Sequence, residues 1–104
     1  MVIIFQNEKA RRHLLEEGFV VTFRKNKRKG VNLNDWMTDK RGGKKIADVK
    51  IFEMCGCDVG FLKSLVKWSG FRSHEEWKTE IGVLNKEETK DYSIGWLYLV
   101  VVRD

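Results

Sequence analysis

Basic side chains are most concentrated in this sequence between residues 24 and 45. That segment holds nine basic and two acidic residues, a net charge of +7, whereas the remaining 82 residues hold 11 basic and 13 acidic residues, a net charge of −2. Basic residues that serve only solubility are mixed with acidic ones along a chain. The separation of the two signs instead favours a surface that neutralises the phosphates of a nucleic acid.

Ten residues of this segment are candidate contacts for nucleic acid. Its basic side chains form two groups, at 24–29 and 40–45, and a short apolar stretch that carries Trp36 separates them. An aromatic ring among cations can stack on an unpaired base and contribute about 1–3 kcal/mol, although a tryptophan on a strand is more often part of the core. The expected contacts are Arg24, Lys25, Lys27, Arg28, Lys29, Trp36, Lys40, Arg41, Lys44 and Lys45.

Glu76 is the acidic side chain with two interpretations. Residues 73–76 read Ser-His-Glu-Glu, the pattern of a capping box, which explains Glu76 by its place at a helix start. In a hydrolase, a glutamate near Lys44 or Arg24 could act as general base. Because the sequence shows no Ser–His–Asp order, phosphate-binding glycine loop or paired carboxylates, we predict no catalytic residue and keep the hydrolase as the alternative.

The cysteines and histidines do not indicate a metal site. Cys55 and Cys57 are poorly spaced for a disulfide within an extended strand. Zinc needs four ligands, and the only other soft donors are His13 and His74, of which we expect His13 to face solvent. We therefore expect reduced thiols and neither metal nor cofactor.

Nothing in the sequence predicts a membrane segment. No apolar run approaches the ~20 residues of a membrane-spanning helix. Residues 1–5 are too short for a signal peptide. We expect a cytoplasmic protein with no membrane partner.

Strands and helices must hold the two basic loops in place. β-branched and aromatic runs predict strands, while helical spacing with Asn7, Asp58 and Ser73 as N-caps predicts helices. We expect strands over 2–5, 19–23, 33–37, 46–52 and 94–102, and helices over 8–17, 59–68 and 73–81. This order predicts one α+β domain over 1–104, a closed or nearly closed barrel of about five to six strands with two to three helices. Its core should include Trp68, Phe71, Trp77 and Trp96.

Four stretches are spread in order over nearly the whole chain. They are Thr22-Phe23-Arg24, the basic loop and strand of 41–49, the Gly-Phe, Ser and Glu-Trp positions of 70–77, and Gly95-Trp96-Leu97-Tyr98. Together these stretches resemble the activating signal cointegrator homology (ASCH) domain of the PUA-like superfamily, in its short archaeal type. The resemblance implies a PUA-like barrel with a cleft at one end and a role in binding RNA. Some members are small nucleases, or amidohydrolases that act on modified nucleosides.

The glycine-x-lysine signature that many ASCH domains carry near the cleft is not matched here, because Val31 and Asn32 follow Gly30. This departure favours binding over catalysis. We therefore expect a module that binds RNA or single-stranded nucleic acid through basic loops 24–29 and 40–45 flanking a cleft. Duplex DNA and an acidic protein partner stay open as other ligands of the same face.

Overall fold

The order of elements expected from the sequence is confirmed. The structure is a computed structural model that describes residues 2–29 and 35–103. Within those ranges it is an α+β fold of five strands and three helices. The elements are β1 (Val2–Ile4), α1 (Glu8–Glu17), β2 (Phe19–Arg24), β3 (Asp35–Thr38), β4 (Ala47–Asp58), the 3-10 helix η1 (Val59–Trp68), α2 (His74–Asn85) and β5 (Ile94–Val102). Part of the expected strand 33–37 lies outside the described residues.

Three elements differ from expectation in extent or type. β4 continues to Asp58 because β5 offers an antiparallel partner along its whole length, past a bulge between Glu53 and Cys55. Its second half is largely exposed, which is why the sequence pattern there resembles a loop. Residues 59–68 form a 3-10 rather than an α-helix, although Asp58 caps it as expected. α2 continues four residues beyond Ile81.

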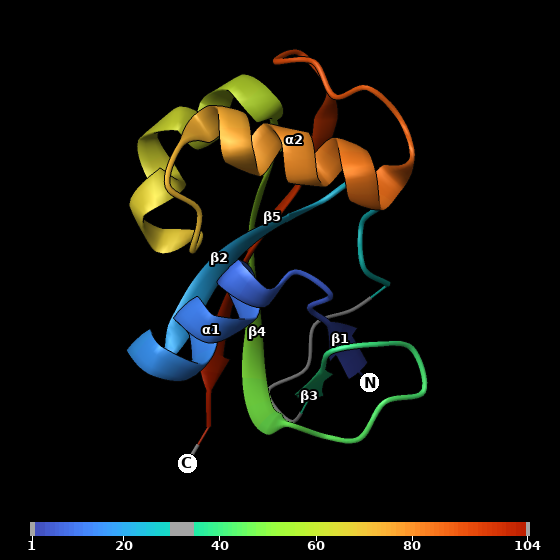
Figure 1. Ribbon diagram of the computed structural model, residues 1–104, viewed down its shortest axis with the longest axis vertical. Coiled ribbons are helices and arrows are strands. Elements are labelled where there is room, and N and C mark those ends of the chain that lie inside the picture. Colours follow the sequence, from blue (N-terminus) through green and yellow to red (C-terminus); the bar gives the residue numbers. More distant parts are fainter. Residues whose placement is uncertain (1, 30–34, 104) are drawn as a thin grey trace.

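The five strands form one mixed sheet in the order β1-β3-β4-β5-β2 (Figure 1). β1 and β3 are parallel, and every other neighbouring pair is antiparallel. β1 and β2 are the two edges and do not pair with each other within the described residues, so the sheet is open and the expected barrel does not close. In Figure 1, α1 and α2 lie in front of β2, β4 and β5.

Arginine side chains satisfy the carbonyl groups along the free edge of β1. Nη2 of Arg24 donates to the carbonyl oxygen of Ile4 at 3.0 Å, and Nη2 of Arg28 donates to that of Val2 at 3.4 Å. Just past the strand, Nη1 of Arg11 donates to the carbonyl oxygen of Phe5 at 2.9 Å. Buried backbone carbonyls need such partners. Two arginines from the β2 side thus bridge the opening of the sheet.

Arg28 is held inside the protein as well as at this edge. Its Nη2 lies 3.7 Å from Oδ2 of Asp35, whose side chain is 0% exposed, and its own side chain is 14% exposed. Its backbone N–H donates to the hydroxyl of Tyr98 at 2.8 Å. Arg28, one of the expected contacts to nucleic acid, therefore lies beside a buried carboxylate and is itself only slightly exposed.

The core fills the space between the strands and the helices. Its fully buried members include Ile3 of β1, Met37 of β3, Leu14 of α1, Leu62 of η1 and Val100 of β5. The expected core residues Phe71 and Trp77 are buried, and Trp68 and Trp96 are partly buried against them.

Both ends of α1 are capped as the sequence predicts. Asn7 accepts hydrogen bonds from the backbone of Lys9 and Ala10, and Gly18 takes a φ of 84° as it ends the helix. The expectation for His13 is wrong. This side chain is partly buried, and its Nδ1 bonds to the carbonyl oxygen of Phe19 at 2.8 Å while its ring meets the Phe19 ring edge-on.

None of the helices in residues 2–29 and 35–103 is long and apolar enough to cross a membrane. The longest, α2, has 12 residues.

Replacing Arg28 with methionine should destabilise the fold by about 3–5 kcal/mol, because it removes the cation that lies 3.7 Å from the fully buried carboxylate of Asp35. Chemical denaturation followed by tryptophan fluorescence measures this change. The control is Lys29→Met, which removes the same charge from the neighbouring exposed side chain and should change stability by less than about 0.5 kcal/mol. Equal losses in the two variants would contradict a structural role for Arg28.

Candidate nucleic-acid interface

Three of the expected basic contacts are paired with acids at the surface. Nζ of Lys25 lies 2.6 Å from Glu87, that of Lys27 3.8 Å from Glu53, and that of Lys45 3.2 Å from Asp48. Lys27 also lies over the Trp96 ring, at 4.8 Å from its centroid. Exposed pairs of this kind contribute about 0–1 kcal/mol each. Their lysines can therefore exchange a carboxylate for a phosphate at little cost.

Four other expected contacts carry charge that no acid offsets. Lys29, Lys40, Arg41 and Lys44 are exposed and form no ion pair with any described residue. The loop that holds the last three is ordered by backbone contacts. Thr38 donates its hydroxyl to the carbonyl oxygen of Lys44 at 2.7 Å, and Gly43 N–H donates to that of Lys40 at 2.9 Å. These cations therefore extend from a defined loop.

Trp36 lies on β3 between Val2 and Asp48 of the neighbouring strands. It is partly buried and is not among the residues packed against the core. It also does not line the cavity described next.

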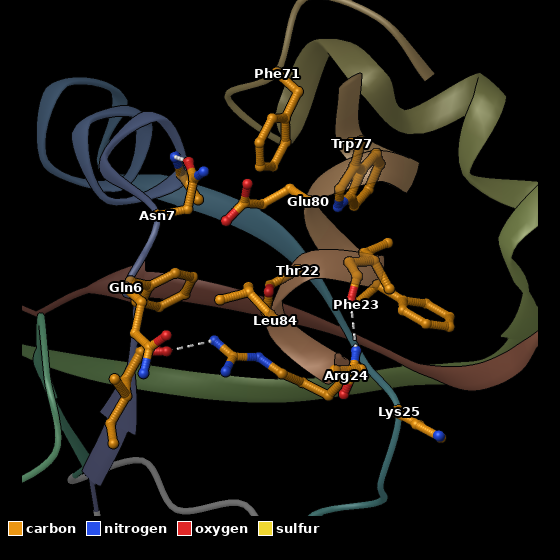
Figure 2. Close-up of a pocket in the computed structure, with 15 residues that line it drawn as sticks. Gln6, Asn7, Thr22, Phe23, Arg24, Lys25, Phe71, Trp77, Glu80 and Leu84 are labelled. Atoms are coloured by element: carbon orange, nitrogen blue, oxygen red, sulfur yellow. Dashed lines mark hydrogen bonds between the residues drawn. The ribbon is translucent and has the colours of Figure 1, made fainter. Parts of the chain in front are cut away.

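A cavity of about 250 Å³ lies where the ends of β1 and β2 meet α1 and α2 (Figure 2). Aromatic side chains form much of its wall, and polar groups from three elements reach it. Of the ten expected contacts, only Arg24 and Lys25 line it; the other residues that matter below are Phe5, Thr22, Phe71, Trp77 and Glu80.

The aromatic wall combines a stacked pair with a single ring. Phe71 and Trp77 are almost parallel, with an interplanar angle of 14° and ring centroids 6.1 Å apart. Phe5 lies under the guanidinium of Arg24, 5.0 Å from ring centroid to Cζ. Flat apolar surfaces of this kind suit a planar ligand.

Arg24 supplies the positive charge of the cavity. One of its Nη atoms bonds to Ile4, whereas its Nε is buried and has no hydrogen-bond partner among the described residues. Burial, and secondarily the charge of Arg28, lowers the pKa of Arg24 to about 10, and Tyr98 partly opposes this. The group therefore stays charged at neutral pH. A buried donor without a partner is costly.

Glu80 supplies the negative charge. It lies on the same face of α2 as Trp77, Ile81 and Leu84, as helical spacing requires. Figure 2 shows its side chain extending across the cavity toward Asn7. No described residue forms an ion pair or hydrogen bond with its carboxylate, so both oxygens stay available as acceptors. The expected helix 73–81 included Trp77, Glu80 and Ile81 but ended before Leu84, the fourth residue of this face.

Glu76 lies outside the cavity lining. Its Oε2 pairs with Nζ of Lys9 at 2.9 Å, and its Oε1 accepts from the backbone of Arg72 at 3.1 Å. These two contacts lower the pKa of Glu76. Ser73 caps α2 by accepting from the backbone of Glu76, as the capping box predicts. A glutamate held charged in this way is a poor general base at neutral pH.

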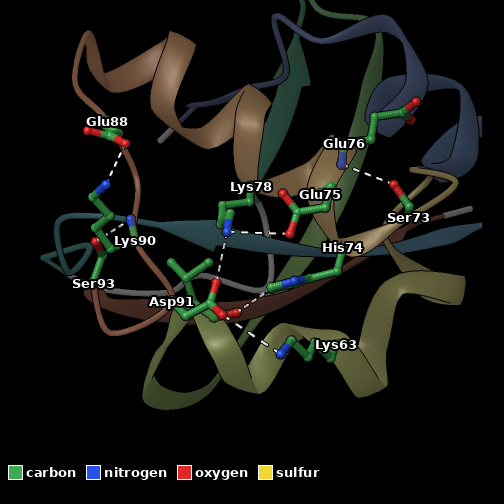
Figure 3. A network of polar contacts seen from close by, with 11 residues as sticks. Lys63, Ser73, His74, Glu75, Glu76, Lys78, Glu88, Lys90, Asp91 and Ser93 are labelled. Atoms are coloured by element: carbon green, nitrogen blue, oxygen red, sulfur yellow. Dashed lines mark hydrogen bonds and ion pairs between the residues drawn. The ribbon is translucent and has the colours of Figure 1, made fainter.

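A polar network fixes α2, and with it one wall of the cavity (Figure 3). Asp91, in the segment before β5, accepts from Nζ of Lys78 at 3.0 Å and lies 3.7 Å from Nζ of Lys63. These contacts lower the pKa of Asp91 and raise that of Lys78. Nε2 of His74 bonds to the carbonyl oxygen of Val59 at 3.0 Å. The network thus joins α2 to η1 and to the start of β5.

The two cysteines are free thiols, as expected. The described residues contain no group of three or more metal-binding side chains. Burial, followed by the effects of Cys55 and Asp58, raises the pKa of Cys57 to about 11. Cys57 is therefore protonated at neutral pH and weakly nucleophilic.

In a Cys55→Ser variant, alkylation of Cys57 by iodoacetamide should keep accelerating well above pH 9, because burial, the largest cause of the raised pKa, is unchanged and only the thiolate reacts. Mass spectrometry of samples quenched across the pH series measures the rate. The same variant unfolded in guanidinium chloride is the control and should show a midpoint near the ordinary value of 9.0. Identical pH profiles for folded and unfolded protein would refute the effect of burial.

Comparison with known proteins assigns no family to this chain. None of the protein-family models, curated proteins or solved structures compared with it matches it.

Proposed function

We propose that this protein binds single-stranded nucleic acid, RNA in the first instance, with one unpaired base in the cavity and the flanking phosphates on the basic loops. The observation that carries the proposal is the position of Arg24 and Lys25. They line an aromatic-walled cavity and also begin the basic segment. A base and its adjoining phosphate group need this combination of flat apolar walls and nearby cations.

The second basic loop is connected to the cavity through Phe5. Phe5, which lines the cavity, donates its N–H to the carbonyl oxygen of Thr38 at 2.9 Å. Thr38 in turn donates its hydroxyl to the carbonyl oxygen of Lys44 at 2.7 Å. Two hydrogen bonds thus connect the cavity wall to the loop that carries Arg41 and Lys44. A nucleic-acid strand whose base enters the cavity can therefore contact cations on both sides of that base.

The size of the cavity supports a single base as the part that enters. Its volume of about 250 Å³ is below the ~300–1,000 Å³ of sites for drug-sized ligands. A paired base cannot enter without leaving its stack, whereas an unpaired base can. The proposal therefore favours single strands or loops over duplexes.

A hydrolase is the weaker candidate. That function required Glu76 near Arg24 or Lys44, and Glu76 instead lies outside the cavity lining in an ion pair with Lys9. The charges and the cavity support binding without requiring a reaction. The resemblance to ASCH domains, a PUA-like fold and a cytoplasmic location remain parts of the proposal.

The double change Arg41→Ala and Lys44→Ala should weaken binding of a labelled 12-nucleotide oligouridine, measured by fluorescence anisotropy across a salt series. Loss of two phosphate contacts should reduce the slope of log K against log salt by about 1.4. The matched control is Lys50→Ala with Lys67→Ala, two exposed lysines on β4 and η1, which removes the same charge from other elements and should leave the slope nearly unchanged.

Two results would refute this proposal. One is equal loss of affinity in both double variants, because binding would then follow net charge alone. The other is no binding of RNA by the wild-type protein at low salt. Duplex RNA and duplex DNA of the same length are measured in parallel, and tighter binding of either duplex than of the single strand would contradict entry of an unpaired base.

A further inference from the structure

We infer that the base the cavity accepts is guanine, selected by Glu80 on one side and Arg24 on the other. This inference rests on the proposed function and adds the identity of the base. It starts from two polar groups that the fold leaves without enough partners. These are the carboxylate of Glu80 and the guanidinium of Arg24, whose one hydrogen bond to a described residue is that from Nη2 to Ile4, and both residues line the cavity.

The two groups present opposite hydrogen-bonding characters. An ionised carboxylate only accepts and has two oxygens side by side, whereas a guanidinium only donates. Figure 2 draws Glu80 and Arg24 on opposite sides of the cavity, with Thr22 between them. A planar ligand between them must offer donors along one edge and acceptors along another.

Guanine has that distribution of groups. Its N1–H and N2–H₂ are adjacent donors that can meet both oxygens of one carboxylate, and its O6 and N7 are acceptors that suit arginine. Adenine, cytosine and uracil each offer a single donor group, so a carboxylate facing them keeps one oxygen unpaired. Leaving a buried polar group unpaired discriminates strongly against the wrong ligand.

The aromatic wall can hold a base without distinguishing one base from another. Phe71 and Trp77 can stack on any base, because every base has a flat face. Selection therefore falls to Glu80 and Arg24. Since Arg24 also bonds to Ile4 and bridges the open sheet, Glu80 is the residue whose change tests selection with the least effect on the fold.

The experiment compares labelled oligouridine 12-mers that differ only at one central position, which is guanosine, adenosine, cytidine, uridine or inosine. Fluorescence anisotropy at fixed salt gives each affinity. Wild-type protein should prefer guanosine to the other natural bases by about tenfold, as one bidentate contact provides. Inosine lacks the N2 amino group, so it should lose most of that preference.

Glu80→Gln is the decisive variant, because it keeps the shape of the side chain and replaces one acceptor oxygen with a donor. Its preference for guanosine should fall to within about twofold, and replacing guanosine with inosine should then have almost no effect. The matched control is Glu17→Gln, an exposed glutamate on α1 with the same change of charge, which should keep the wild-type preference for guanosine.

Failure of this inference can be told apart from failure of the proposed function. Salt-dependent binding of every oligomer without preference for guanosine would overturn the choice of base and leave the binding function intact. A guanosine preference that Glu80→Gln does not change would also overturn the inference. If no oligomer binds at low salt, both proposals are wrong. Circular dichroism of each variant verifies that the fold is retained.

Discussion

The unpaired edge of β1 is the constraint on which the rest of the structure depends. The sheet ends in β1 on one side and β2 on the other, and the two edges do not meet within the described residues. Guanidinium groups of Arg24 and Arg28 bridge the opening by bonding to the carbonyl oxygens of Ile4 and Val2. Side chains span a wider gap than a ladder of backbone hydrogen bonds, whose strands lie ~4.7–4.9 Å apart. That wider gap is where the cavity forms.

The same constraint divides the basic segment into side chains with different roles. Arg28 lies beside a buried carboxylate, and its side chain is only 14% exposed. Arg24 serves the sheet and the cavity together, because one part of its guanidinium bonds to β1 while its Nε stays unpaired. Lys40, Arg41 and Lys44 are exposed and form no ion pair with any described residue. Net charge alone could not separate these roles, since each side chain counts as +1.

The sequence predicted the elements well because local rules govern them. Asn7, Gly18 and Ser73 cap helices as their chemistry requires, and the order of strands and helices follows from apolar spacing. It predicted the site less well. The cavity depends on α2 continuing to Asn85 and on which acid pairs with which cation, and both are decided by contacts between distant residues. The sequence pattern offered Glu76 as a possible general base, whereas Glu80, one turn later, is the glutamate that lines the cavity.

Nuclear magnetic resonance of ¹⁵N-labelled protein titrated with a short unlabelled single-stranded RNA tests the central claim most directly. If an unpaired base enters the cavity, the indole N–H of Trp77 and the backbone amide of Thr22 should show large, saturable shifts, because a stacked base alters the field at both. Amides of loop 40–45 should shift at the same time. Shifts confined to the basic loops, with Trp77 and Thr22 unchanged at saturation, would contradict the account.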